Sequence, residues 1–219
     1  MEHPIITRSV RQQKRAGRVS IFLDGEFAFG AQDDVVYRFG LAKGVTMTPE
    51  LRVQVESANA VLEGKRAAER LIARRLRGSG EIRLALRKKG YAQEVIDVVV
   101  EDFTRAGLLD DAEFAAAFVR DRMRFKPKSR TMLERELEAR GVSPSIVRAV
   151  LGELLGGDAE RVAAQALARK YLARRAQDTP DVLRRRAFSY LLRRGYSASL
   201  VSAVLQELIT RSPDEYVEE

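Results

Sequence analysis

Residues 86–103, LRKKGYAQEVIDVVVEDF, contain the pattern that decides the fold of this chain of 219 residues. A short basic run ends at Gly90, and apolar residues then return five, six, nine, ten and thirteen positions later. These offsets place the apolar residues on one face of an α-helix. Glycine readily adopts the left-handed backbone conformation that ends many helices. Gly90 is therefore predicted to end one helix shortly before the next begins.

The same pattern occurs twice more, anchored on Gly141 and Gly195, so the anchors are spaced by 51 and then 54 residues. A leucine stands four residues before each glycine: Leu86, Leu137 and Leu191. Each unit also has an earlier apolar stretch of helical spacing, at 67–76, 114–123 and 162–172. Units of about 50 residues bury little surface alone, so neighbours must stack. The sequence predicts a mainly α protein of three tandem three-helix repeats in an elongated array.

The N-terminal third has a different composition, with β-branched and aromatic residues on both sides of Asp24-Gly25. An Asp-Gly pair between two such runs is the typical signal of a β-hairpin with a two-residue turn. This turn would pair Phe22 with Phe27 and Ser20 with Phe29. The three aromatic side chains Phe22, Phe27 and Phe29 would then share one face, which is a candidate contact surface.

Helical segments are expected to follow the hairpin. The stretch 33–39 is amphipathic and is followed by Gly40, which suits the end of a short helix. Thr48 and Pro49 are typical of a helix start, with Thr48 as the N-cap. This second helix is expected to continue into the 70s, with or without a break near Gly64.

These observations divide the chain into five segments. They are a hairpin and helix module (1–48), a linker helix with the first repeat (49–109), the second repeat (110–158), the third repeat (159–211) and an acidic tail (212–219).

The composition excludes several classes of protein. There is no cysteine, so disulfides and cysteine-containing zinc sites are ruled out. The single histidine, His3, lies in an N-terminus expected to be frayed, so a histidine-dependent triad or a multi-histidine metal site has almost no material. No catalytic, cofactor-binding or metal-binding residue is expected, and the chain is predicted not to be an enzyme. The longest apolar run is six residues (114–119) and no signal peptide is visible, so we expect a cytoplasmic protein without membrane contact.

The charge indicates a polyanionic or acidic partner. The 39 basic and 31 acidic residues give a net charge of +8, and the isoelectric point is about 10.0. The excess lies in residues 61–109 (+4) and 159–211 (+7), whereas residues 110–158 are neutral. The candidate partner- or DNA-binding residues are Arg70, Arg74, Arg83, Arg87, Lys88, Lys89, Arg184, Arg185, Arg193 and Arg194. A solvated charged face is the alternative interpretation.

Few aromatic residues interleave with these clusters in the sequence, so stacking on unpaired bases is not indicated. Contacts to phosphates or carboxylates are expected instead, with little base specificity. The tightest acidic cluster before the tail, around Asp110 and Asp111, is interpreted as a helix cap rather than a metal site.

The chain resembles the RecX family of bacterial regulatory proteins, which modulate the RecA recombinase. The resemblance rests on residues 18–30 with 35–41, on Arg83-Leu-Ala-Leu-Arg-Lys-Lys-Gly90, and on Gly107-Leu-Leu-Asp-Asp111 followed by Phe114-Ala115. It implies binding to the RecA–DNA filament, usually with inhibition of ATP hydrolysis and strand exchange, in recombination, DNA repair and the SOS response. The neutral second repeat and the Arg184–Arg186 run of the third leave open which repeat dominates filament contact.

We therefore expect a non-enzymatic, monomeric regulator that binds the RecA filament, and single-stranded or duplex DNA through phosphates. Two alternatives come from other classes. A stand-alone regulator of the helix-turn-helix type would bind duplex DNA without RecA. A metal-dependent nuclease would need several carboxylates converging on a divalent ion.

Overall fold

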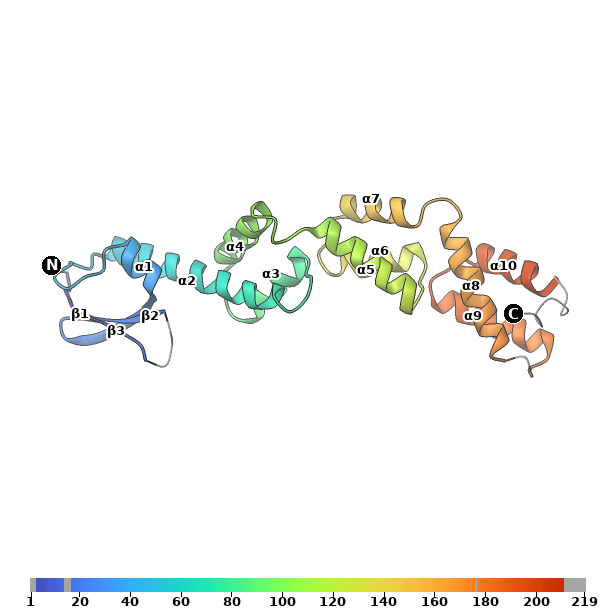
Figure 1. Cartoon of the computed structure of the whole chain (residues 1–219), viewed down its shortest axis with the longest axis horizontal. Helices are drawn as coiled ribbons and strands as arrows, with labels where there is room; N and C mark the ends of the chain where they lie inside the picture. The colour runs from blue at the N-terminus through green and yellow to red at the C-terminus, as the bar shows by residue number, and fades with distance from the viewer. Residues whose placement is uncertain (1–2, 14–16, 176, 211–219) are drawn as a thin grey trace. The chain divides into compact units, whose positions relative to one another are not determined.

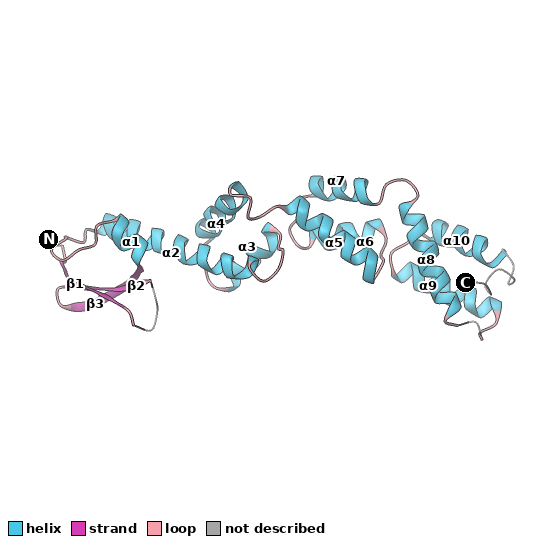
Figure 2. Cartoon of the chain, in the orientation of Figure 1, coloured by secondary structure: helices cyan, strands magenta, loops and turns pink. Residues whose placement is uncertain are grey.

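The computed structural model describes residues 3–13, 17–175 and 177–210, so the acidic segment 212–219 lies outside the described residues. The chain forms two compact units, one of residues 1–77 and 81–109, the other of residues 78–80 and 110–219. Within the described part, strands occur only in the N-terminal segment and all later elements are helices (Figure 2). The predicted fold class, mainly α with three three-helix repeats and a small N-terminal β module, is confirmed.

The first unit begins with a three-stranded antiparallel sheet in the order β1 (Ile6–Arg11), β2 (Arg18–Leu23) and β3 (Glu26–Gln32) (Figure 1). Asp24 and Gly25 connect β2 to β3 with φ angles of 48° and 92°, as a type I′ turn requires. The predicted hairpin is confirmed. The expectation of a frayed N-terminus is wrong from residue 6 onward, because β1 pairs with β2 along its length.

The register of the hairpin differs from the prediction beyond its first pair. Phe22 pairs with Phe27 as expected, but Phe29 pairs with Ile21 instead of Ser20 because a β-bulge shifts the register. One extra residue moves every later side chain to the other face. Phe29 consequently packs against the buried core of the module, whereas Phe27 is 60% exposed. The prediction of three aromatic side chains on one face is wrong.

Two helices complete the packing of this module. Helix α1 (Asp33–Arg38) contacts β2 and β3, and Gly40 follows it with a φ angle of 59°. Helix α2 (Pro49–Ile72) starts as predicted, because the Thr48 hydroxyl oxygen accepts a hydrogen bond from the Leu51 N–H at 3.2 Å. Helix α2 continues without a break through Gly64. A Cβ at Gly64 would lie 3.1 Å from Val99, so this glycine permits the close approach of α4.

Three similar groups of helices account for the rest of the described chain. The first repeat combines the end of α2 with α3 (Ser79–Lys88) and α4 (Gln93–Arg105). The second has α5 (Asp111–Phe125), α6 (Arg130–Glu138) and α7 (Pro144–Leu154). The third has α8 (Ala159–Ala173), α9 (Pro180–Arg193) and α10 (Ala198–Thr210).

The predicted anchors of the repeats are confirmed. Gly90, Gly141 and Gly195 have φ angles of 84°, 82° and 88°, so each ends its helix in the left-handed conformation. The leucine four residues before each glycine is fully buried in a separate apolar core, as are the valines or isoleucines of the following helix: Ile96, Val147 and Val201.

The second and third repeats, which belong to the same unit, are joined by hydrogen bonds. The backbone N–H of buried Ser129 donates to the Arg194 carbonyl oxygen at 3.0 Å. The Arg194 guanidinium donates to the Pro127 carbonyl oxygen at 3.2 Å, and the Arg130 N–H donates to the Glu160 carboxylate at 2.9 Å. These contacts join the start of α6 and the loop before it to the end of α9 and to the start of α8.

Candidate functional site

The basic residues of the first repeat fall into two groups. The Arg83 guanidinium forms an ion pair with Asp97 of α4, and Arg87 donates a hydrogen bond to the Gln93 side-chain oxygen at 3.0 Å. Hydrogen bonds from Arg83 and Gln93 hold the pKa of Asp97 below its ordinary value. The other four candidates are exposed and have no carboxylate partner among the described residues: Arg70, Arg74, Lys88 and Lys89.

The basic residues of the third repeat are mostly directed to solvent. Ala187 on the inner face of α9 is fully buried, and Arg184, Arg185 and Arg193 of the same helix are exposed. None of these three has a carboxylate partner in the part of the chain that the structure describes. The fourth candidate, Arg194, is half-buried and occupied by its hydrogen bond to the second repeat.

An aromatic pair lies among these arginines. Tyr171 of α8 and Tyr190 of α9 stack with ring centroids 4.5 Å apart. The Arg175 guanidinium lies 5.2 Å from the centroid of Tyr171, and that of Arg194 lies 5.1 Å from Tyr190. The sequence showed few aromatic residues interleaved with the basic clusters, but the fold brings these two rings among the arginines. The two tyrosines are 19 positions apart in the sequence and meet only because α8 and α9 pack together.

Two cations of the second repeat are ion-paired with the same carboxylate. The Glu136 carboxylate accepts a hydrogen bond from Arg122 at 3.0 Å and forms an ion pair with Lys128. Burial acts to raise the pKa of Glu136, but hydrogen bonds from Lys128 and Arg122 outweigh burial and hold the pKa below its ordinary value. Arg122 and Arg140 also lie over the Phe118 ring, at 4.7 and 4.5 Å.

The acidic cluster before α5 serves as two helix caps. An Asp110 carboxylate oxygen accepts hydrogen bonds from the N–H groups of Ala112 and Glu113, at 2.8 and 3.0 Å, which confirms the predicted cap. Asp111 instead accepts from the N–H and hydroxyl of Ser79, at 2.7 and 2.6 Å, within the same unit. Within residues 3–13, 17–175 and 177–210, no group of three or more His, Cys, Asp or Glu side chains is placed to hold a metal ion.

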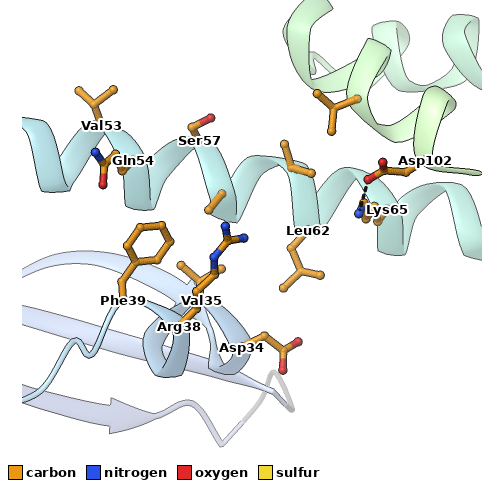
Figure 3. Close-up of a pocket in the computed structure, with 13 residues that line it drawn as sticks. Asp34, Val35, Arg38, Phe39, Val53, Gln54, Ser57, Leu62, Lys65 and Asp102 are labelled. Carbon is orange, nitrogen blue, oxygen red and sulfur yellow. Dashed lines mark ion pairs between the residues drawn. The ribbon is translucent and has the colours of Figure 1, made fainter.

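The first unit has a depression of about 750 Å³ between α1, α2 and α4 (Figure 3). Its lining combines apolar and polar side chains, with Val35 and Phe39 on one side and Val53 of α2 on the other. At one end Lys65 and Asp102 form an ion pair at 2.5 Å, and the hydrogen bond from Lys65 lowers the pKa of Asp102. The two charges neutralise each other, so this depression is not part of the basic surface.

The outer face of the N-terminal sheet holds the remaining candidates. Phe22 and Phe27 meet edge to face with centroids 5.9 Å apart, and the Arg8 guanidinium lies 4.2 Å from the centroid of Phe22. Arg8 comes from β1, which the sequence analysis missed. This face therefore presents Arg8, Phe22 and Phe27, and it does not include Phe29, which packs inward.

Comparison with known proteins identifies the family. Sequence models of the RecX N-terminal domain and of the first, second and third RecX three-helix domains match residues 4–48, 65–103, 110–151 and 159–205, respectively. The chain belongs to the RecX family.

Curated relatives of this RecX-family chain carry the name regulatory protein RecX. The protein of Bacillus licheniformis is 29% identical over 204 residues, which cover 93% of this chain and 77% of the relative. That of Clostridium acetobutylicum is 26% identical over 216 residues, or 97% of this chain and all of the relative. RecX is a family of regulatory proteins, and this chain is placed among regulators on that basis.

Solved RecX structures share the fold. One crystal structure of regulatory protein RecX superposes with a TM-score of 0.71 at 21% identity, covering 93% of this chain and 99% of that one. RecX from Lactobacillus salivarius gives a TM-score of 0.60 at 23% identity, covering 69% of this chain and 97% of that one. None of the helices described in this RecX-family chain is both long enough and apolar enough to span a membrane.

Proposed function

We propose that this chain binds the RecA–DNA filament and inhibits RecA-dependent ATP hydrolysis and strand exchange. In this role it acts in the cytoplasm, as a monomer and without catalysis of its own, in DNA recombination, repair and the SOS response. DNA is contacted through phosphates and without sequence specificity.

One observation carries this proposal beyond family membership. Arg184, Arg185 and Arg193 of α9 are exposed and lack carboxylate partners among the described residues, in the most basic segment of the chain. Like charges grouped on one helix repel each other, and an opposing polyanion relieves that repulsion. DNA phosphates or an acidic RecA surface supply such a partner. Arg70, Arg74, Lys88 and Lys89 form a second surface of the same kind in the first repeat.

The test measures RecA-dependent ATP hydrolysis on single-stranded DNA with increasing amounts of the chain. The wild type should reduce the rate, and the triple variant R184A/R185A/R193A should require much more protein for the same reduction. Its melting temperature should match that of the wild type, because exposed substitutions usually change stability by about 0.5 kcal/mol or less. Binding to DNA should also become less dependent on salt, by about 0.7–0.9 log–log units for each phosphate that the variant no longer neutralises.

A matched control comes from the neutral second repeat. The variant R120A/R135A/R148A removes the same charge from three exposed arginines outside the candidate surface. It should inhibit RecA like the wild type. If the two triple variants behave alike, net charge and not the α9 surface governs binding. If the wild type leaves ATP hydrolysis unchanged, the proposed inhibition is wrong.

The alternative of a stand-alone helix-turn-helix regulator is tested separately. Such a protein gathers its base contacts on one recognition helix, whereas the candidate binding cations here are spread over the first and third repeats. A footprint at a defined duplex sequence in the absence of RecA would favour the alternative.

A further inference from the structure

The third repeat contains an open depression of about 400 Å³ between α8 and α9, in the size range of small-molecule sites. One wall is the ring of Tyr171, which is backed by Tyr190 at 4.5 Å with an angle of 23° between the ring planes. The other residues that line it are Arg175, Arg185, Arg186, Ser189 and Arg193.

The charge in this depression is strongly positive. Of its four guanidinium groups, only that of Arg186 is held by a carboxylate of the described chain, Asp178, at 2.6 Å. The Arg175 guanidinium lies over the Tyr171 ring, 5.2 Å from its centroid, so a base that stacks on this ring takes the place of Arg175. Arg185 and Arg193 are exposed. An aromatic surface bordered by unneutralised arginines can bind a flat ring and a phosphate group side by side.

A second depression of about 340 Å³ lies next to the first and extends the surface along α9. The two depressions share Arg185 and Ser189. The second lies between α9 and α10, and it adds the ring of Phe188, the guanidinium of Arg184 and the carboxylate of Asp181. Aromatic and arginine side chains therefore line both of these adjacent hollows. This is the arrangement by which proteins follow a single strand, with bases on rings and phosphates on cations.

The second repeat shows that the packing of these helices does not demand an aromatic pair. Tyr190 and Glu136 each stand five residues before the anchoring glycine of their repeat. Tyr171 and Arg122 each stand seven residues after a fully buried alanine, Ala164 or Ala115. The same position between helices thus holds an Arg122–Glu136 ion pair in one repeat and a tyrosine stack in the other.

From these observations we infer that α8 and α9 form a binding subsite for single-stranded DNA, in which an unstacked base lies on Tyr171 and flanking phosphates contact Arg185 and Arg193. A base inside a duplex is stacked on its neighbours and does not present a free face to a tyrosine, so the subsite selects single strands. The inference deepens the proposed function, since it assigns the DNA contact to a particular surface and to bases as well as phosphates.

The test uses the full chain without RecA. The anisotropy of a labelled dT 20-mer is compared with that of an abasic 20-mer, which has the same phosphates and no bases. The wild type should bind the dT 20-mer about tenfold more tightly, the effect of one stacked base. The variant Y171R/Y190E, which has the residue pair of the second repeat at the same net charge, should bind both strands with the affinity of the abasic one. R185A/R193A should weaken binding to both strands by similar factors.

Two further variants control for folding. Tyr171→Phe keeps the ring and should keep the preference for the dT strand. Tyr171→Leu keeps an apolar contact with Tyr190 and should lose the preference even if Y171R/Y190E does not fold, as judged by circular dichroism and melting. Equal binding of the two strands by the wild type would overturn the inference, as would an unchanged preference in Y171L.

The outcome is separate from that of the proposed function. If the wild type inhibits RecA yet binds dT and abasic strands equally, the proposed function stands and the subsite does not. If it prefers the dT strand but leaves RecA-dependent ATP hydrolysis unchanged, the subsite stands and the proposed action on RecA fails.

Discussion

The second and third repeats have the same three-helix fold and the same buried anchors but opposite surfaces. In the second, Glu136 joins Arg122 and Lys128, and the repeat has no net charge. In the third, the corresponding position is the ring of Tyr190, and the arginines around it are left without carboxylates except at Arg186. An ion pair of one arginine and one glutamate in the second repeat is thus replaced by two stacked tyrosines in the third, where the surrounding surface is basic and aromatic.

The comparison distinguishes positions that are required for folding from positions that can vary for binding. The positions that build the fold are buried and apolar in both repeats, so they are set by packing. The positions between the first and second helices are half-exposed and accept either an ion pair or stacked rings, so they are free to serve binding. Function in this family member is expected where the repeats differ.

The largest effect should come from the shared core. Leu137→Ala and Leu191→Ala each remove a fully buried leucine from the same position, so each should lower the free energy of unfolding by about 2–5 kcal/mol. Urea unfolding followed by circular dichroism measures both. If one variant loses less than half as much as the other, the two cores are not equivalent.

A smaller effect is expected at Glu136, because the third repeat has a tyrosine at this position and no corresponding ion pair. Glu136→Gln leaves Arg122 and Lys128 without their carboxylate and should cost about 1–2 kcal/mol at neutral pH. Because the pKa of Glu136 is lowered in the folded state, its contribution is complete above the ordinary value of 4.5 and is lost as the pH falls through the folded-state value. The wild type and E136Q should therefore converge in stability on acidification, and a constant difference down to pH 3 would contradict this account.

The helix caps offer a third contrast. Asp110 accepts two backbone hydrogen bonds at the start of α5, whereas the Asp158 side chain makes no capping hydrogen bond at the start of α8. Asp110→Ala should cost about 1 kcal/mol, and Asp158→Ala about 0.5 kcal/mol or less. Thermal melting of the two variants side by side provides the measurement. Equal losses would show that the capping geometry is not what distinguishes them.

The smallest effect at neutral pH is expected at Tyr196, which follows Gly195 where the second repeat has Val142. Tyr196 is 2% exposed, and its hydroxyl has no hydrogen-bond partner among the described residues. Tyr196→Phe should be neutral or stabilise the chain by up to about 1 kcal/mol.

The difference in stability between the wild type and Y196F should grow at alkaline pH. Burial raises the pKa of Tyr196 to about 12, so above pH 10 the unfolded side chain ionises while the folded one does not. The wild type should lose stability between pH 10 and 12 by an amount that Y196F does not lose. If the stability of the wild type and of Y196F depends on pH in the same way, burial does not raise the pKa of Tyr196.

The repeats, their glycine anchors and the hairpin turn could be predicted because each depends on residues close together in sequence. Strand β1 could not, since its side chains from Thr7 onward are half-buried or exposed and give no apolar alternation. The bulge that turns Phe29 inward is a backbone irregularity without a residue signature. In the candidate site, the charge pattern singled out Arg184, Arg185 and Arg193, and the structure places all three at the surface.

Contacts between helices could not be predicted from the sequence. The Tyr171–Tyr190 stack, the Arg83–Asp97 ion pair and the hydrogen bond from Arg194 to Pro127 each join residues that only the packing of two helices brings together. The sequence grouped Arg83 and Arg194 with the other candidate binding residues, although Arg83 is ion-paired with Asp97 and Arg194 is hydrogen-bonded to Pro127.

The bond between the Ser129 N–H and the Arg194 carbonyl has a consequence for the evolution of the chain. Tandem repeats arise by duplication, and a repeat that meets its neighbour only through side chains can be gained or lost in one step. Here the contact is backbone to backbone, so loss of the third repeat would remove the acceptor of a main-chain hydrogen bond and expose to water a position that is now buried. No single substitution restores that acceptor. The second and third repeats are therefore expected to be gained or lost together, although the sequence pattern repeats in single units.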